Sequence, residues 1–471
     1  FVENNLPSYE TPEEAVRAYL TMYTYRRNLD HLYETPAELP VHEQPDKREL
    51  KATIREMLRK GRTLLNEEES KNLLVRYGIP ATVPQFAKDA DTAVSTADKL
   101  GYPVVIKVVS PDISHKSDVG GVMLGLTSGA ALKQACETLL QTVSKRAPQA
   151  LIQGVAVQRM IENVDYELIL RAKRDKDFGS VILFGVGGTT AEFFKDFSIG
   201  LPPLNQTLAK MVMQETKAYK MLQGFRGKPP ANFKELEEVL VRFSNLIVDF
   251  PEIAEINIDP LAIADGKTYA LDASMVIDRD SVEHKSRYPH LVITPYPTRY
   301  ITSWKLPDGV EVLLRPIKAE DEPLQQEMAA SLSHETIRTR FFSSVKDVSS
   351  HEWLILFCNI DYDRHVAIVA EITENGKRKI IGVGRLVMEA DFQSGEFAIL
   401  VHDRYQGRGL GYKLVGMLIE IGRERELKEI VGDVLTENEN MLKLARKLGF
   451  TAQWAPDGIT KITLKLENTG K

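Results

Sequence analysis

Cysteine is scarce in this sequence, and long apolar runs are missing from it. Its 471 residues include two cysteines, Cys136 and Cys358, so we expect no disulfide framework and a reducing, cytoplasmic setting. No apolar stretch approaches the roughly 18 residues that a membrane-spanning helix needs. The net charge of -6 gives no global reason to expect nucleic-acid binding. The composition therefore predicts a globular protein with neither a membrane nor a nucleic acid as partner.

A chain of this length is too long for a single hydrophobic core, so we expect more than one domain. Proline-rich passages indicate the linkers between the domains. We expect a helical tail with a linker at 1–47, a large α/β domain at 48–285, a linker at 286–305 and a smaller domain at 306–471. Thr11 and Pro12 are good start signals for the helix of the tail. The first residue is Phe1 rather than methionine, and we expect the sequence to be a piece of a longer protein.

A glycine-rich segment at 406–411 lies between a strand-like run and a helix-like run. The residues before it, 396–401, are mostly apolar, and Leu410 and Leu414 begin a helically spaced apolar series after it. A turn of this kind offers unpaired backbone N–H groups and the positive end of a helix dipole. Gly409 and Gly411 have no Cβ, so a phosphate can approach the backbone closely. The segment therefore predicts a pyrophosphate-binding loop.

The order of residues in this loop, Gln/Arg-x-x-Gly-x-Gly/Ala after a strand, resembles the acetyl-CoA loop of the GNAT acyltransferases. Residues 436–450 resemble the second cofactor segment of the same family, and the likeness spans roughly 310–466. It implies a central mixed sheet. It also implies contacts with acetyl-CoA at Leu400, Val401, Gln406, Gly407, Arg408, Gly409, Leu410, Gly411, Tyr412 and Asn438.

Acyl transfer to an amine needs a base, because a free lysine titrates near ~10.4. Our candidate is Glu396, which shares a strand face with Ala398 and Leu400, an apolar surface expected to raise a carboxylate pKa. The GNAT resemblance also implies a catalytic glutamate here. The competing interpretation of Glu396 is a solvent-exposed carboxylate at a strand end. Weaker alternatives for the base are Glu389, Asp391 and Glu437. The sequence indicates no clear general acid.

The large domain carries polar residues inside strand-like runs. Lys107 interrupts an apolar run at 104–109, and such a lysine is costly unless it meets an anion, for which a nucleotide phosphate is a natural partner. Asn257 and Asp259 share a strand face, and Asp272 follows downstream. Oxygen-bearing side chains of this kind suit Mg²⁺. These residues predict a nucleotide site with a magnesium ion.

From Leu65 to Asp278 the chain resembles the ATP-grasp domain of NDP-forming acyl-CoA synthetases, with matching segments at 65–70, 77–80 and 224–227. The resemblance implies nucleotide contacts at Lys107, Gln158, Met160, Gly187 and Gly188, metal ligands at Asn257, Asp259 and Asp272, and a phosphohistidine relay at His115. Two departures stand out. The acid and the amide are exchanged at positions 257 and 259, and Gly200 stands where many of these ligases have arginine. We expect no active phosphotransfer, because the CoA-binding half of such synthetases is missing from the sequence.

The predicted fold class is therefore α/β (α+β), an ATP-grasp domain followed by a GNAT acyltransferase domain with a central mixed sheet. This pairing resembles bacterial protein lysine acetyltransferases. It implies transfer of acetyl from acetyl-CoA to lysines of metabolic enzymes such as acyl-CoA synthetases, with a regulatory ATP-grasp region that binds ATP or ADP and Mg²⁺ where these sites are retained. The implied partners are those protein substrates, the N-terminal CoA-binding half and further copies of the chain in a homo-oligomer.

Two other functions stay open at this point. The chain could be the ATP-binding part of an ADP-forming acetate–CoA ligase with a fused GNAT regulator. It could also be an N-acetyltransferase that acts on small amines. A nucleotide-sensing module without catalysis is the non-enzymatic alternative. The target lysine and the preference for acetyl over longer acyl groups do not follow from the sequence.

Overall fold

The computed structural model describes residues 7–32, 47–113, 116–188, 196–278, 288–342, 350–456 and 458–466. Contacts within the chain separate two compact units. One contains Leu39–His284 with Tyr288–Ile293, and the other contains Thr294–Lys471 with Phe1–Glu38 and Lys285–Arg287. Among the described residues, every helix is too short or too polar to cross a membrane.

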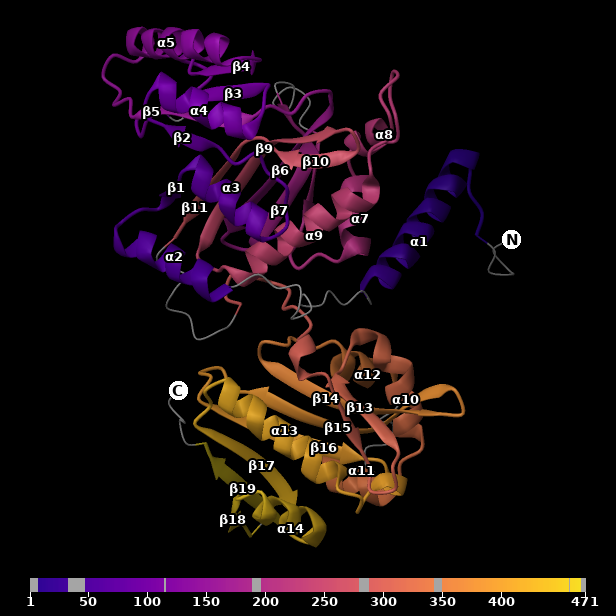
Figure 1. Cartoon of the computed structure of the whole chain (residues 1–471). Coiled ribbons are helices and arrows are strands. Elements are labelled where there is room, and N and C mark those ends of the chain that lie inside the picture. The colour runs from indigo at the N-terminus through magenta and orange to yellow at the C-terminus, as the bar shows by residue number, and fades with distance from the viewer. Residues whose placement is uncertain are drawn as a thin grey trace. The chain divides into compact units, whose positions relative to one another are not determined.

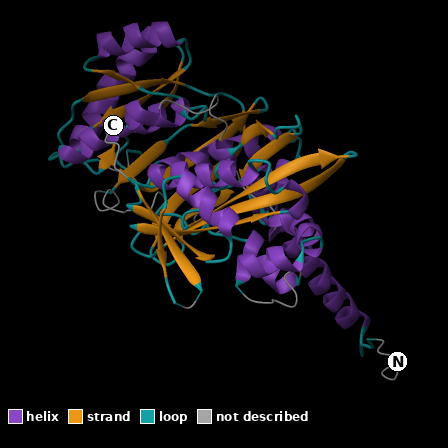
Figure 2. Cartoon of the chain, turned by 90° about the horizontal axis from the view of Figure 1, so that it is seen from below, coloured by secondary structure: helices purple, strands orange, loops and turns teal. Residues whose placement is uncertain are grey.

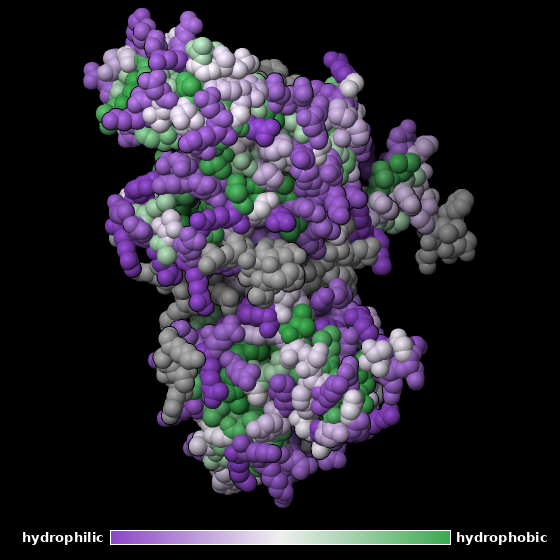
Figure 3. All heavy atoms as spheres, viewed as in Figure 1, coloured by the Kyte–Doolittle hydropathy of each residue, from purple (hydrophilic) through white to green (hydrophobic). Residues whose placement is uncertain are grey.

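Helix α1, Pro12–Leu32, confirms the helix predicted for the tail. The Thr11 hydroxyl accepts a hydrogen bond from the N–H of Glu14 at 3.3 Å, and Glu13 and Glu14 place negative charge at the positive end of the helix dipole. Apolar atoms gather on this helix in Figure 3, where Val16 and Leu20 are exposed.

The unit around residues 47–278 is built on two sheets (Figure 1). The larger sheet has the order β1-β11-β9-β6-β7-β8, with β10 paired to β9, and the smaller sheet has the order β2-β5-β3-β4. The strands are β1 (Leu64–Leu65), β2 (Gln85–Ala87), β3 (Val104–Val109), β4 (Val122–Leu126), β5 (Gly154–Arg159), β6 (Val164–Asp175), β7 (Gly179–Val186), β8 (Phe197–Gly200), β9 (Ile253–Ala264), β10 (Lys267–Ala270) and β11 (Ala273–Ile277).

Helices cover these sheets and bury their apolar faces. They are α2 (Lys47–Arg59), α3 (Glu67–Arg76), α4 (Ala90–Leu100), α5 (Gly129–Arg146), α7 (Gln206–Gln214), α8 (Ala218–Leu222) and α9 (Phe233–Asp249). In α9, the Asn232 side chain accepts a hydrogen bond from the N–H of Glu235 and caps the helix. Its apolar stripe, which includes Leu240 and Phe243, lies in one core with Ile256 of β9.

The other unit contains one mixed sheet with the order β12-β13-β14-β15-β16-β17-β19-β18. Figure 2 shows its strands and helices by type. The strands are β12 (Thr302–Lys305), β13 (Glu311–Pro316), β14 (His365–Glu374), β15 (Lys377–Met388), β16 (Ser394–Val401), β17 (Glu429–Leu435), β18 (Thr451–Trp454) and β19 (Ile459–Lys465). The helices are α10 (Glu322–Ala330), α11 (His334–Phe341), α12 (His351–Cys358), α13 (Leu410–Glu424) and α14 (Glu439–Lys447).

Helix α13 packs closely on β15 because that strand presents glycines to it. A Cβ on Gly382 would lie 3.2 Å from Leu410, and one on Gly384 would lie 3.4 Å from Leu414 and Leu418. These contacts fix the start of α13 beside the ends of β15 and β16, and they bury Leu410 completely.

Strands β16 and β17 separate along their length. They pair in parallel only from Ser394 to Glu396, although β16 continues along β15 to Val401 and β17 continues along β19 to Leu435. The backbone N–H and C=O groups on this edge of residues 397–401 therefore face a gap in the sheet instead of a neighbouring strand.

Candidate functional site

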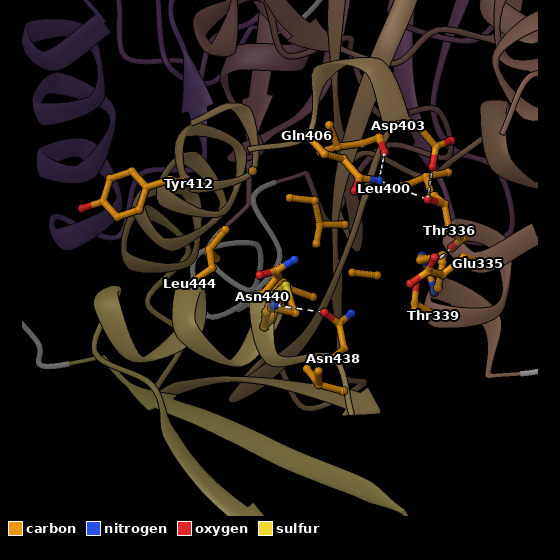
Figure 4. Close-up of a pocket in the computed structure, with 18 of the residues that line it drawn as sticks. Glu335, Thr336, Thr339, Leu400, Asp403, Gln406, Tyr412, Asn438, Asn440 and Leu444 are labelled. Carbon is orange, nitrogen blue, oxygen red and sulfur yellow. Dashed lines mark hydrogen bonds between the residues drawn. The ribbon is translucent and has the colours of Figure 1, made fainter. Parts of the chain in front are cut away.

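The gap between β16 and β17 opens into a cavity of about 580 Å³. One wall is the backbone of β16 from Glu396 to Val401, and the opposite wall contains Asp433 of β17 and Asn438. The glycine-rich loop closes one end of it, and α11 flanks it (Figure 4). The cavity therefore brings together most of the residues that the sequence assigned to an acyl-CoA site.

The loop has the backbone geometry expected of an anion-binding turn. Gly407 and Gly409 have φ values of +71° and +83°, in the left-handed region that favours glycine, and no atom lies within 4 Å of where their Cβ atoms would be. Gly409 caps the N-terminus of α13. The first N–H groups of that helix have no partner within the helix, so they are available to an anion at the open loop.

Gln406 connects this loop to its surroundings. Its side-chain amide donates to the carbonyl oxygen of Val401 and to the Thr336 hydroxyl, both at 3.0 Å. Asp403, just before it, accepts hydrogen bonds from the N–H and hydroxyl of Ser333 and from the Thr336 hydroxyl (Figure 4). Although partial burial raises the pKa of Asp403, these bonds lower it below its usual value. The end of β16 is thus tied to the start of α11.

The side chains of three predicted cofactor residues are already engaged within the protein. The Arg408 guanidinium forms an ion pair with Asp308 at 2.6 Å. Leu410 is fully buried, so only its backbone can reach a ligand. The ring of Tyr412 packs under the Lys447 amine, and Tyr412 stands apart from Asn438 in Figure 4. Leu400, Val401, Gly411 and Tyr412 line the cavity as predicted.

Asn438 stands at the start of α14 and lines the cavity. Its side-chain oxygen accepts a hydrogen bond from the N–H of Met441 at 3.1 Å and caps the helix. This bond uses one lone pair of the oxygen, and the amide nitrogen can still donate to a ligand.

Glu396 lines the same cavity but is not enclosed by an apolar surface, so this part of the sequence interpretation is wrong. Its side chain is exposed. The reason is the flanking helix: α11 contributes the polar residues Glu335 and Arg340 to the cavity, which the strand pattern could not indicate. Burial lowers the pKa of Arg340, and the nearby Glu396 carboxylate opposes that effect. Among the alternatives, Glu437 forms an ion pair with Arg338, whereas Glu389 and Asp391 do not line the cavity.

In the ATP-grasp unit, the anion beside Lys107 is a carboxylate of the chain itself. Its amine lies 2.5 Å from Glu67. Glu67 also binds Lys71 at 2.8 Å and lies 3.5 Å from Lys116. Burial alone would raise the pKa of Glu67, but the charges of Lys71 and Lys107 lower it to about 2. The anion beside Lys107 is thus the Glu67 carboxylate, where the sequence predicts a nucleotide phosphate.

Lys71 is the most deeply buried cation of this cluster. Its amine binds the carbonyl oxygens of Thr82 and Leu271 and the side-chain oxygen of Gln158. Burial lowers its pKa to about 8. The polar end of Gln158, a predicted nucleotide contact, is therefore already bonded to Lys71. Glu67 and Lys71 are four residues apart, a spacing that by itself indicates an ordinary helical surface pair.

The other predicted nucleotide residues flank the same region. The N–H of Met160 donates to the carbonyl oxygen of Pro103 at 3.0 Å. Gly187 packs against Leu168, where a Cβ would lie 2.3 Å from the backbone, and Gly188 donates its N–H to Asp259 at 3.2 Å. His115 lies outside the described residues. Gly200 is buried against Val212, whose side chain would lie 2.8 Å from a Cβ there, so no arginine fits.

The predicted magnesium ligands are bound to an arginine. Arg171 of β6 donates from Nε to Asn257 at 2.5 Å and from Nη2 to Asp259 at 3.1 Å. The Asp272 carboxylate lies 3.9 Å from the Lys107 amine. Within the described parts of the chain, no group of three or more His, Cys, Asp or Glu side chains is arranged to hold a metal ion. In this arrangement the residues do not fit a divalent ion.

Comparison with known proteins assigns both regions. A family model for the ATP-grasp domain matches residues 56–277, and one for the acetyltransferase (GNAT) domain matches residues 311–451. The beta subunit of the ADP-forming acetate–CoA ligase I of Pyrococcus furiosus is 37% identical over 231 residues, which are 48% of this chain and 98% of that protein. An acetyltransferase of Pseudomonas aeruginosa is 31% identical over 161 residues, which are 34% of this chain and 86% of that protein.

Longer relatives match over the ATP-grasp region. The ADP-forming acetate–CoA ligase I of Archaeoglobus fulgidus is 35% identical over 277 residues, which are 59% of this chain. The chain spans only 40% of the length of that ligase. By these similarities, and with sheets and helices in the predicted places, the chain belongs to the ATP-grasp family of ADP-forming acyl-CoA synthetase beta subunits over residues 56–277 and to the GNAT acetyltransferases over residues 311–451.

Proposed function

We propose that the chain transfers an acetyl group from acetyl-CoA to lysine side chains of protein substrates such as acyl-CoA synthetases. The observation that carries this proposal is the gap between β16 and β17, which has an anion-binding helix start at one end and Glu396 in its wall. The unpaired edge of β16 can pair with the amides of a pantetheine arm as a further strand would. The loop can hold the pyrophosphate.

The cavity also suits an amine. Glu335, Glu396 and Asp433 are exposed carboxylates in its lining, and they favour the approach of a cationic side chain. Glu396 then takes the proton that the amine must lose, directly or through a water. The neutral nitrogen attacks the thioester carbon and forms a tetrahedral intermediate, whose oxyanion a backbone N–H of β16 stabilises. The C–S bond then breaks, the nitrogen loses its second proton to solvent, and the thiolate takes a proton from solvent.

The first test is transfer of labelled acetyl from acetyl-CoA to a folded acyl-CoA synthetase, with the modified lysine located by mass spectrometry. Glu396→Gln keeps the size of the side chain and removes the base, so we expect kcat/KM to fall by about 10² to 10⁴. Binding of acetyl-CoA, measured by calorimetry, should not change. Glu389→Gln is the matched control, since it alters an exposed glutamate outside the cavity lining.

Two results would contradict this proposal. Full activity of Glu396→Gln would remove Glu396 as the base. Binding of acetyl-CoA without label on any protein, but with label on free polyamines or amino acids, would assign the chain to small-amine acetylation.

A second function has direct support for the ATP-grasp region. The 37% identity to a ligase beta subunit over nearly its whole length favours a role as the ATP-binding part of an ADP-forming acyl-CoA ligase, with the GNAT domain as a fused partner. This similarity supports that role more directly than it supports lysine as the acetyl acceptor. Formation of ADP from ATP together with acyl-CoA, after addition of a CoA-binding subunit, would establish this function. In the first proposal, the same region binds adenine nucleotide as a regulator.

A further inference from the structure

In the ATP-grasp unit an arginine stands at the position predicted for a metal ion. Arg171 lies directly opposite Asn257 in the pairing of β6 with β9. Its guanidinium reaches across two polar residues of β9, with Nε on Asn257 and Nη2 on Asp259. The second oxygen of Asp259 accepts the N–H of Gly188. The side-chain oxygens of Asn257 and Asp259 are therefore all engaged by donors from the chain.

A divalent ion and this guanidinium cannot share the site at low cost. Charges of the same sign repel at short range, and the repulsion from a divalent ion is twice that from a monovalent one. The third predicted ligand does not compensate, because Asp272 is half exposed and its nearest described cation is the amine of Lys107. A magnesium ion here would have to displace Arg171 from two hydrogen bonds.

Basic side chains already neutralise the carboxylates of this part of the unit. Among the described residues, four basic side chains, Lys71, Lys107, Lys116 and Arg171, stand with four carboxylates, Glu67, Asp259, Asp272 and Glu167, the last of which borders Gly188. The charges are thus balanced without any metal. Arginine offers five donors in a rigid planar fork and is suited to phosphate oxygens.

We propose that Arg171 is the resident cation beside Asn257 and Asp259 and replaces the divalent ion, so that the domain binds an adenine di- or triphosphate without Mg²⁺. This inference rests on the nucleotide binding proposed above. A guanidinium bound to β9 supplies positive charge for binding, but it cannot move with a transferring phosphoryl group as a bridging Mg²⁺ does. The site is therefore suited to sensing a nucleotide rather than to consuming it.

The test measures ADP binding by calorimetry in EDTA and in excess Mg²⁺, and it measures Mn²⁺ binding without nucleotide by electron paramagnetic resonance. The wild-type chain should bind ADP in EDTA with an affinity within about twofold of that in Mg²⁺, and it should hold no tight Mn²⁺. Arg171→Ala frees Asn257 and Asp259, so we expect Mn²⁺ to bind at least about tenfold more tightly and ADP in EDTA about tenfold more weakly. Arg171→Lys should keep ADP binding in EDTA.

Arg76→Ala is the matched control. Arg76 lies in the same unit, forms an ion pair with Glu49, and has the same side-chain exposure as Arg171, 46%. Its removal should leave ADP and Mn²⁺ binding unchanged. Binding of ADP that requires Mg²⁺ in the wild-type chain, or a tight Mn²⁺ site in that chain, would overturn the inference while nucleotide binding stands. Absence of ADP binding under both conditions would overturn nucleotide binding as well, and acetyl transfer by Glu396 would be unaffected.

Discussion

Glu67 is the residue on which the polar interior of the ATP-grasp unit depends. It lies within 3.5 Å of three lysine amines, and Lys71 among them has no solvent-exposed surface. A buried ion pair of this kind adds little stability when compared with apolar residues, but removal of one partner leaves an uncompensated charge. Loss of Glu67 would therefore leave the buried charge of Lys71 without a counter-charge.

We predict that Glu67→Gln lowers the free energy of unfolding by about 3 kcal/mol, because Lys71 loses its counter-charge inside the protein. Glu56→Gln removes a lysine pair at the surface, where both side chains are about two-thirds exposed, and should have almost no effect on stability. Urea unfolding at pH 7 measures both. Equal effects of the two substitutions would show that the cluster around Glu67 does not hold a buried charge.

The effect of Glu67→Gln on the free energy of unfolding should depend on pH. Since the folded-state pKa of Glu67 is about 2, below the ordinary 4.5, its stabilising contribution is present above pH 4.5. It is lost as the pH falls from about 4.5 toward about 2. The difference in stability between the wild-type chain and Glu67→Gln should therefore shrink across that window.

At the scale of secondary structure, the acyl-CoA cavity depends on how α11 is attached. Ser333 caps α11, and Asp403, after β16, accepts hydrogen bonds from its N–H and hydroxyl. Thr336, one turn into the helix, binds both Asp403 and Gln406. These bonds set the position of the wall that carries Glu335 and Arg340.

We predict that Asp403→Ala costs about 1 kcal/mol of stability, because Ser333 and Thr336 lose the carboxylate that accepts their hydrogen bonds. It should also raise the KM for acetyl-CoA, because α11 and the end of β16 are no longer held together. Steady-state kinetics with varied acetyl-CoA measure this effect. Glu335→Ala is the comparison, since it alters the same wall without releasing it. A larger effect on KM from Glu335→Ala than from Asp403→Ala would argue against the attachment.

The elements of this site follow from local sequence, but their long-range contacts do not. The apolar run at 396–401 and the leucines after Gly409 predict β16 and α13, because each pattern is set by neighbours along the chain. The contact of Arg171 with Asn257 joins residues 86 positions apart, and it depends on the register of β6 with β9. No periodicity encodes such a register. The surroundings of Glu396 were misjudged for the same reason, since Arg340 comes from a different element.

At the scale of the whole chain, the two compact units have separate cores. We predict two unfolding transitions in calorimetry, each raised by one ligand. At about 100 times its Kd, a ligand adds about 2.7 kcal/mol, or roughly 5 to 10 °C for a unit of this size. Acetyl-CoA should raise only the transition of the GNAT unit, and ADP only that of the ATP-grasp unit. A single transition raised by both ligands would show that the units unfold together.

The gap between β16 and β17 also determines how the reaction ends. In the proposed function, its walls and the loop at 406–411 contact the pantetheine arm and the pyrophosphate, which acetyl transfer leaves unchanged. Free CoA is therefore expected to bind nearly as well as acetyl-CoA and to compete with it. The rate would then follow the ratio of acetyl-CoA to free CoA. It would depend on the acetylated fraction of the CoA pool more than on the total CoA concentration.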